Sequence, residues 1–309
     1  MIRMPGRSHT GRLPALTEDE VRICERLRKH VRILAGDIGE RSIWRPGSLN
    51  ASAQYIEESF RSEGCSVARQ EFDVQGTIVA NIEAVVNGTS GLKEIVLVGA
   101  HYDTVPGSPG ANDNASGIAA ILELARLLSS RNSTREIRLV AFANEEPPFF
   151  RTRYMGSRVY ASRSRKQGED IVAMLSVETI GHYSHAKGSQ TYPFPFGFFY
   201  PGSGNFIGFV GNLASQSLVR RCVASFRQHT AFPSEALCAP GWVTGVGWSD
   251  HWSFWREGYP AAMITDTALF RDQCYHTISD TPEKLDYDSS ARVVGGIGRL
   301  VTEFAVSPA

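Results

Sequence analysis

Three short apolar segments of this 309-residue chain end in side chains that bind metal ions well. They are residues 94–100 before His101 and Asp103, residues 137–143 before Glu145 and Glu146, and residues 171–177 before Glu178. Such runs, with turn residues behind them, are typical of strands buried on both faces of a sheet. In an open α/β sheet, ligands bind beyond the carboxyl ends of the strands. Together with Asp113 and His276, these side chains predict a metal site at one sheet edge, with room for two ions.

His101 and Asp103 are separated by one residue at the end of an expected strand. On an extended chain this spacing points both side chains the same way. A histidine that binds a metal usually donates its other ring N–H to a carboxylate or carbonyl group, which fixes the orientation of the ring. We therefore expect Asp103 to orient His101. A single His-x-Asp is structural in most proteins, so this interpretation depends on the other motifs.

Asp113 lies in the polar segment 110–117, directly before a predicted helix. An aspartate at such a position is typical of a turn that caps a helix. In the company of other ligands, its two carboxylate oxygens are able to bridge two cations. Both interpretations stay open for this residue alone.

The adjacent acids Glu145 and Glu146 repel each other at the mouth of a sheet unless cations lie beside them. If Glu146 binds a metal ion, Glu145 faces elsewhere and is able to take a proton from metal-bound water. Metal binding lowers the pKa of that water toward ~7. A pair of structural acids is the alternative interpretation.

His276 completes the count of ligands, although a lone histidine before a Thr- and Asp-rich loop is more often an ordinary surface residue. With it, two ligand sets share Asp113: His101, Asp113 and Glu178 form one, and Asp113, Glu146 and His276 form the other. Mixed histidine and carboxylate ligands suit zinc in an open catalytic site. The sequence lacks His-Glu-x-x-His, which excludes the common helical zinc protease.

The triplet Ser249-Asp250-His251 contains the residue types of a serine hydrolase. The chain has no Gly-x-Ser-x-Gly motif, and adjacent side chains on an extended segment point apart, so no triad is expected. Asp250 is instead predicted to line or support the pocket. Nearby aromatic residues fit either ordinary packing or an apolar specificity wall: Trp248, Trp252, Trp255 and those of residues 194–200.

Composition favours one large α/β domain, because 42% hydrophobic residues suffice for a substantial core. Charges balance at 32 basic and 32 acidic residues without a basic stripe, which argues against a nucleic-acid partner. No apolar run approaches the roughly 18 residues of a membrane span. The five cysteines lack C-x-x-C spacing and are expected to be reduced thiols, with a single bridge, for instance one involving Cys222 and Cys238, as the alternative. Residues 1–16 are predicted to form a flexible tail without a signal peptide, which favours a cytoplasmic location.

Residues 17–309 are predicted to form one undivided catalytic domain. Helices are expected over residues 17–34, 50–63, 117–129, 213–228 and 289–304. Further strands are expected over residues 70–74, 78–86, 206–210 and 261–265.

Together these motifs resemble the co-catalytic zinc aminopeptidases of metallopeptidase family twenty-eight, which includes bacterial leucyl aminopeptidase, glutamate carboxypeptidase II and the glutaminyl cyclases. The resemblance starts near Thr17 and rests on residues 99–104, 112–117, 144–146, 275–277 and 280–281. It implies a three-layer α/β/α sandwich around a mixed, mostly parallel sheet, with a cis peptide after Asp113. It also implies these site residues: His101, Asp113, Glu146, Glu178 and His276 as ligands, Glu145 as general base, and Tyr275 near the ligands or the substrate.

Glu178 departs from the family pattern, because many two-zinc members have Asp at this position. The resemblance nevertheless predicts a zinc aminopeptidase that hydrolyses N-terminal peptide bonds, with a metal-bridged water activated by Glu145 and a peptide or aminoacyl substrate. Two zinc ions are expected, or one if the chain is a glutaminyl cyclase-type acyl transferase. A non-catalytic interaction domain of the same fold is a further alternative. Family members are often exported, which weighs against the cytoplasmic location.

Overall fold

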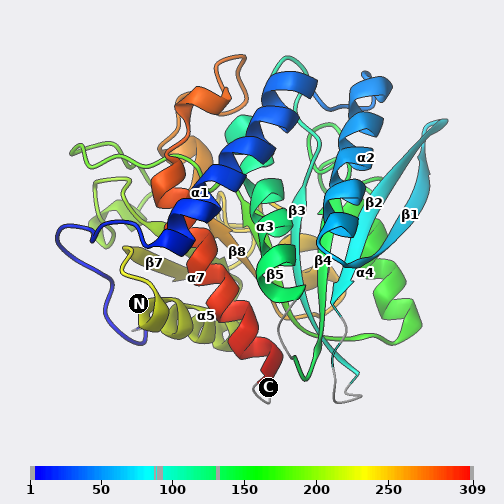
Figure 1. Ribbon diagram of the computed structural model, residues 1–309. Helices are drawn as coiled ribbons and strands as arrows, with labels where there is room; N and C mark the ends of the chain where they lie inside the picture. The colour runs from blue at the N-terminus through cyan, green and yellow to red at the C-terminus, as the bar shows by residue number, and fades with distance from the viewer. Residues whose placement is uncertain (1–3, 87, 89–92, 130–132, 307–309) are drawn as a thin grey trace.

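The computed structural model describes residues 4–86, 88, 93–129 and 133–306. These residues form a mixed sheet of eight strands in the order β1-β2-β4-β3-β5-β8-β6-β7 (Figure 1). The strands are β1 Ser66–Val74, β2 Thr77–Val86, β3 Glu94–His101, β4 Glu136–Phe142, β5 Asp170–Glu178, β6 Ile207–Gly211, β7 Ser234–Cys238 and β8 Ala261–Thr265. Strands β4, β3, β5 and β8 run parallel to one another, and β6 and β7 form a second parallel pair that runs antiparallel to β8. The predicted mixed, mostly parallel sheet is confirmed.

Helices cover both faces of this sheet (Figure 1). One face carries α1 Glu18–Val31, α2 Pro46–Ser62, α3 Gly117–Ser129, α5 Gln216–His229 and α7 Tyr287–Val306. The other face carries α4 Gly156–Gln167 and α6 His251–Arg256. This arrangement confirms the three-layer α/β/α sandwich.

Strand β3 shows why the sequence of a central strand is apolar throughout. Val96 and Val98 pack into the core under α3 and α7. Ile95 and Leu97 point to the opposite face and pack with residues of α4 and α6. Because side chains alternate along a strand and both faces are covered by helices, each position has to be apolar. The polar residues can appear only where the strand ends, which places His101 at the sheet edge.

Most predicted elements are present, with shifted ends. Thr17 caps α1 in a capping box with Glu20, since the Glu20 N–H donates to the Thr17 hydroxyl and the Glu20 carboxylate accepts from the Thr17 N–H. The chain then continues as a π-helical segment, Arg32–Ile38. Two helices and one strand were not predicted: α4, α6 and β7.

Residues 4–16 of the predicted tail lie near α5 and α7. The Pro5 carbonyl accepts a hydrogen bond from Arg227, and the Pro14 carbonyl accepts one from Arg292. The flexibility of residues 1–16 stays a prediction. Within the described ranges, no helix is long and apolar enough to cross a membrane. All five cysteines are free thiols in the structure.

Arg41 connects the N-terminal helical region to the loop that leads to Asp113. Its side chain is completely buried, and burial lowers the pKa of the guanidinium to about 10. The guanidinium donates to backbone carbonyls on both sides of this junction: those of Leu34, Gly39, Tyr102, Pro109 and Gly110. One buried cation therefore satisfies a group of carbonyls that would otherwise lack donors.

We expect Arg41→Leu to lower the free energy of unfolding by at least ~3 kcal/mol, because each buried acceptor left unpaired costs ~1–3 kcal/mol. Chemical denaturation measures the change. Arg45→Leu is the matched control, since Arg45 is mostly exposed and pairs with Glu40 at the surface, a contact worth under ~1 kcal/mol. Equal losses in the two variants would contradict the role of Arg41.

Candidate metal centre

The five predicted ligand residues converge at one edge of the sheet. His101 ends β3, Glu178 ends β5, Glu146 follows β4, Asp113 precedes α3, and His276 lies in the loop between β8 and α7. Their nitrogen and oxygen ligand atoms form two groups, each within 4.8 Å: His101, Asp113 and Glu178 in one, and Asp113, Glu146 and His276 in the other. The structure therefore brings these side chains together in the two sets that the sequence predicts.

Asp113 belongs to both groups and presents one carboxylate oxygen to each. Its Oδ1 lies 3.2 Å from Nε2 of His101, and its Oδ2 lies 3.0 Å from Nε2 of His276. His101 Nε2 is also 3.3 Å from Oε2 of Glu178, and His276 Nε2 is 3.3 Å from Oε2 of Glu146. This is the arrangement that a carboxylate bridging two ions requires. The peptide bond between Asp113 and Asn114 is cis, as the resemblance implied.

The ring orientation of His101 is set by the backbone of Asp103. Nδ1 of His101 lies 3.2 Å from the Asp103 carbonyl oxygen and 3.5 Å from its carboxylate Oδ1. Because a carbonyl oxygen only accepts, Nδ1 carries the proton and donates. Nε2 then presents its lone pair to Asp113 and Glu178.

The carboxylate of Asp103 has a role that sequence reasoning missed. Its Oδ1 accepts from the N–H of Glu145 at 3.0 Å, and its Oδ2 accepts from the N–H of Glu146 at 3.1 Å. One aspartate thus holds the backbone of both acids that follow β4. The contact joins residues about forty positions apart, so no local pattern in the sequence indicates it.

Asp280 holds the backbone at Asp113 in the same way. Its Oδ1 accepts from the N–H of Asn112 at 2.7 Å, and its Oδ2 accepts from the N–H of Asp113 at 3.1 Å. The sequence analysis named Asp280 as part of a family motif but predicted no role for it. Two buried carboxylates, Asp103 and Asp280, therefore position the backbone of three acidic site residues.

The electrostatics of the centre indicate a shortage of positive charge. Burial raises the pKa of Glu178, and burial together with the charge of Asp113 raises that of Glu146 to about 8. Burial opposes the charged form of the His276 imidazole. The nearby carboxylates of Asp113 and Glu146 favour that form more strongly, so the pKa of His276 rises to about 10. Burial also works against the charge of Asp113, yet His101 and His276 lower the pKa of its carboxyl group.

These residues fit divalent cations. The buried oxygen Glu146 Oε1 accepts no hydrogen bond from any described residue, and Asp113 Oδ2 meets only Nε2 of His276, at 3.0 Å. Buried carboxylates without donors are stable only when they are paired or coordinate a metal. The donor set of two imidazole nitrogens and three carboxylates is suited to zinc.

Glu145 is buried beside the two groups but belongs to neither. Burial raises the pKa of its carboxyl group well above the usual range. The charges of Glu146 and Glu178 raise this pKa further, whereas the charge of His101 lowers it. Its backbone is fixed by Asp103, while its carboxylate remains available. This position fits an acid–base group better than a ligand.

The segment Ser249–His251 is a turn that starts α6, so the prediction of an extended segment was wrong. Asp250 has helical dihedral angles and precedes the first residue of α6. The helix has only six residues, too few to show helical periodicity. Ser249 Oγ donates to Oε2 of Glu178 at 2.6 Å, and His251 Nε2 bonds to the Val246 carbonyl. Ser249 therefore supports the proposed ligand Glu178. Among the described residues, Ser249 and His251 form no Ser-His-Asp triad with Asp250.

Asp250 is completely buried, and neither of its carboxylate oxygens meets a donor among the described residues. Burial raises its pKa to about 7. The charge of His101 lowers this pKa and that of Glu178 raises it, and the supporting role of Asp250 stays a prediction.

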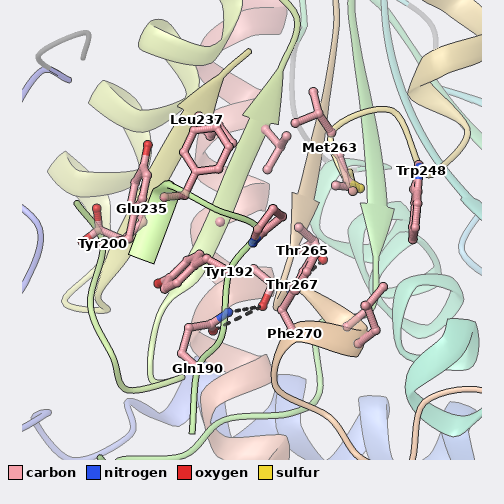
Figure 2. A pocket seen from close by; sticks show the side chains of 18 of the residues that line it. Gln190, Tyr192, Tyr200, Glu235, Leu237, Trp248, Met263, Thr265, Thr267 and Phe270 are labelled. Atoms are coloured by element: carbon pink, nitrogen blue, oxygen red, sulfur yellow. Dashed lines mark hydrogen bonds between the residues drawn. The ribbon is translucent and has the colours of Figure 1, made fainter. Parts of the chain in front are cut away.

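An apolar cavity of about 110 Å³ opens beside the metal centre (Figure 2). Glu178 and Tyr275 form part of its wall, and the ring of Tyr275 stacks on that of His276 with centroids 3.8 Å apart. Of the aromatic residues whose role was left open, Trp248, Phe196 and Tyr200 line the cavity, and so does Tyr192, which was not among them. Trp252 and Trp255 pack elsewhere.

A family model, Peptidase family M28, matches residues 81–301. The chain belongs to this family. The predicted family is confirmed, and membership of it supports a hydrolase that acts on peptides. The chain is 39% identical over 286 residues to the uncharacterized protein YfbL of Escherichia coli strain K12, covering 90% of this chain and 87% of that protein. It is 27% identical over 273 residues to a probable leucine aminopeptidase of Arthroderma otae, covering 82% of this chain but only 65% of that protein.

Solved structures share the fold of this M28 chain. A zinc aminopeptidase from Bacillus subtilis superposes with a TM-score of 0.72 at 18% identity, covering 92% of this chain and 95% of the other. A glutaminyl cyclase from Bacteroides thetaiotaomicron superposes with a TM-score of 0.68 at 18% identity, covering 93% and 98%. Aminopeptidases and cyclases thus share this architecture, so the distinction between them depends on the site.

Removing the Asp280 carboxylate should weaken metal binding without touching a ligand. We expect Asp280→Ala to raise the zinc dissociation constant by about 10–100-fold, the usual effect of losing a group that orients a ligand. Competition with a chromogenic chelator measures it. Glu283→Ala, an exposed acid in the same loop, is the control and should bind zinc like the parent. Parent-like affinity of Asp280→Ala would show that Asp113 needs no such support.

Proposed function

We propose that this chain is a zinc-dependent aminopeptidase that removes N-terminal residues from peptides, with two zinc ions per chain. The observation that carries the proposal is the carboxylate of Asp113, which presents one oxygen to each of two His- and Glu-containing groups. Membership of Peptidase family M28 and similarity to proteins named leucine aminopeptidase support it.

Five residues would hold the ions. His101, Asp113 and Glu178 would hold one, and Asp113, Glu146 and His276 would hold the other. Zinc, when bound, supplies a Lewis acid and lowers the pKa of a water toward ~7. His101 is oriented to bind a metal ion through Nε2, because its Nδ1 donates to the Asp103 carbonyl and its Nε2 faces the carboxylate of Asp113.

Glu145 is proposed as the general base. Its carboxylate lies outside both ligand groups, and its backbone is held by Asp103. It takes a proton from the attacking water and delivers it to the amine that leaves when the peptide bond breaks. Burial raises the proton affinity of this carboxylate, which suits a group that must hold the proton between the two steps.

The excess of carboxylates also supports recognition of a free N-terminal amine. A protonated amine is attracted to a site with more buried acids than cations. Glu178 is well placed for this because it lines both the metal centre and the apolar cavity. An exopeptidase that removes one residue at a time requires such a contact.

A single-zinc glutaminyl cyclase-type transferase remains the main rival, because the fold is shared. The complete second group of Asp113, Glu146 and His276 favours two ions. A non-catalytic interaction domain is disfavoured by the available general base beside a full ligand set.

Glu145→Gln and Glu146→Gln should behave differently, although the two residues are adjacent. Glu145→Gln keeps the side-chain shape but cannot accept a proton, so kcat should fall by ~10²–10⁴-fold while zinc content stays at the parent level. Glu146→Gln should lose zinc together with activity, since ligand and metal are linked. Steady-state kinetics and metal analysis of the same preparations measure both effects. Loss of zinc from Glu145→Gln, or its near-parent kcat, would refute the assignment.

Acetylation of the substrate amine should abolish cleavage. We expect aminoacyl anilides and dipeptides with a free amine to be hydrolysed and their acetylated forms to be inert, because the acetyl group removes the charge that the acidic site recognises. Chromatography of the products distinguishes the outcomes. Equal turnover of acetylated substrates would indicate an endopeptidase or acylase, and cyclisation of N-terminal glutamine would indicate the cyclase.

A further inference from the structure

The apolar cavity beside the metal centre contains a glutamate at the end far from the ions. Glu235 lies on the edge strand β7 and lines the cavity together with aromatic side chains. Figure 2 shows Tyr192, Tyr200 and Glu235 on one side of the cavity and Trp248 on the opposite side. An apolar cavity built only for an aliphatic side chain would have no use for a carboxylate at this position.

The sheet register places Glu235 in line with the metal centre. Glu178 pairs with Thr265, Thr265 pairs with Gly208, and Gly208 pairs with Glu235 across β5, β8, β6 and β7. Directly opposite residues project from the same face of a sheet. Three strand spacings of ~4.8 Å therefore separate Glu178 and Glu235 by about 14 Å.

Gly208 keeps the space between these two glutamates open. It lines the cavity and has no side chain, and a Cβ atom there would lie only 3.2 Å from the Thr265 carbonyl oxygen. With the two side chains projecting in parallel from the sheet, this backbone separation of about 14 Å, less a contact of ~3 Å at each carboxylate, leaves about 8 Å. An extended lysine or arginine fits this length, since its α-amino nitrogen lies roughly 7 Å from its terminal nitrogens.

The carboxylate of Glu235 has acceptor capacity to spare. The neighbouring hydroxyls donate elsewhere, that of Tyr192 to the Pro201 carbonyl and that of Tyr200 to the Ala236 carbonyl. Arg227 is the cation whose charge acts on Glu235, but its guanidinium donates to Ser234 and Pro5. Within the described ranges, which leave out residues 87, 89–92 and 130–132, the Glu235 carboxylate forms no ion pair and accepts no hydrogen bond.

The aromatic walls suit the stem and the charge of a cationic side chain. The rings of Tyr192 and Tyr200 lie 5.7 Å apart, and Phe196 packs against Tyr200 at 6.4 Å. Aromatic faces attract ammonium and guanidinium groups as well as methylene chains. Burial raises the pKa of Glu235, and a bound cation would favour its charged form.

We infer that this cavity receives the side chain of the substrate's N-terminal residue and that Glu235 selects lysine or arginine there. The inference rests on the proposed aminopeptidase function, and it identifies the substrate class as peptides with a basic first residue. Glu235 is a specificity-determining residue that contacts the end of the substrate side chain, about 14 Å across the sheet from Glu178.

The test compares the p-nitroanilides of lysine and norleucine, which have similar length and differ in the terminal charge. With zinc-loaded parent protein at neutral pH, kcat/KM for lysine should exceed that for norleucine by at least about tenfold, the effect of one charge-assisted hydrogen bond. In Glu235→Gln this ratio should fall by at least about tenfold. Glu71→Gln is the matched control, because Glu71 is exposed on β1 at the opposite edge of the sheet, and it should keep the parent ratio.

A parent ratio near one, or an unchanged ratio in Glu235→Gln, would overturn the assignment of Glu235 while leaving the aminopeptidase function intact. If neither anilide is cleaved, the proposed function fails, and calorimetry still tests the cavity. L-lysinamide should then bind the zinc-loaded parent at least about tenfold more tightly than L-norleucinamide, and Glu235→Gln should remove the difference. Equal binding of the two amides would overturn the inference.

Discussion

The constraint on which this structure depends is the burial of several carboxylates at one sheet edge beside only two histidines. Among the described residues, the carboxylates of this cluster without backbone donors are those of Asp113, Glu145, Glu146, Glu178 and Asp250. Such a cluster is unstable unless cations or donors compensate it. Backbone N–H groups compensate two further buried acids, Asp103 and Asp280, which hold the acidic segments in place. The Ser249 hydroxyl donates to Glu178, whereas Glu146 keeps a buried oxygen without a donor among the described residues, which fits a bound cation.

The proposed metal centre and the apolar cavity lie over different strands of the sheet. Three of the five proposed ligands and the proposed base lie at the ends of β3, β4 and β5, whereas the cavity extends across β8, β6 and β7. Glu178 lies at the boundary, because it belongs to a ligand group and also lines the cavity. Chemistry and side-chain selection can therefore be changed separately, through different strands of one rigid sheet.

The sequence predicted the parts of this site that depend on local patterns. β8 and α3 match their expected bounds, since an apolar run and an amphipathic repeat are visible within a few residues. Strand β7 was missed because a glutamate interrupts its five residues, and α4 because its sequence is rich in Arg and Ser. The support by Asp103, Asp280 and Arg41 could not be predicted, since each contact joins segments distant in the chain.

The most direct test of the account is to locate the metal ions. Crystals grown with zinc should show two anomalous scattering peaks at the zinc edge, about 3.5–4 Å apart. Asp113 should lie between them, with His101 and Glu178 at one peak and Glu146 and His276 at the other. Glu145 should coordinate neither ion. A single peak, peaks away from Asp113, or Glu145 bound to an ion would contradict the two-metal centre.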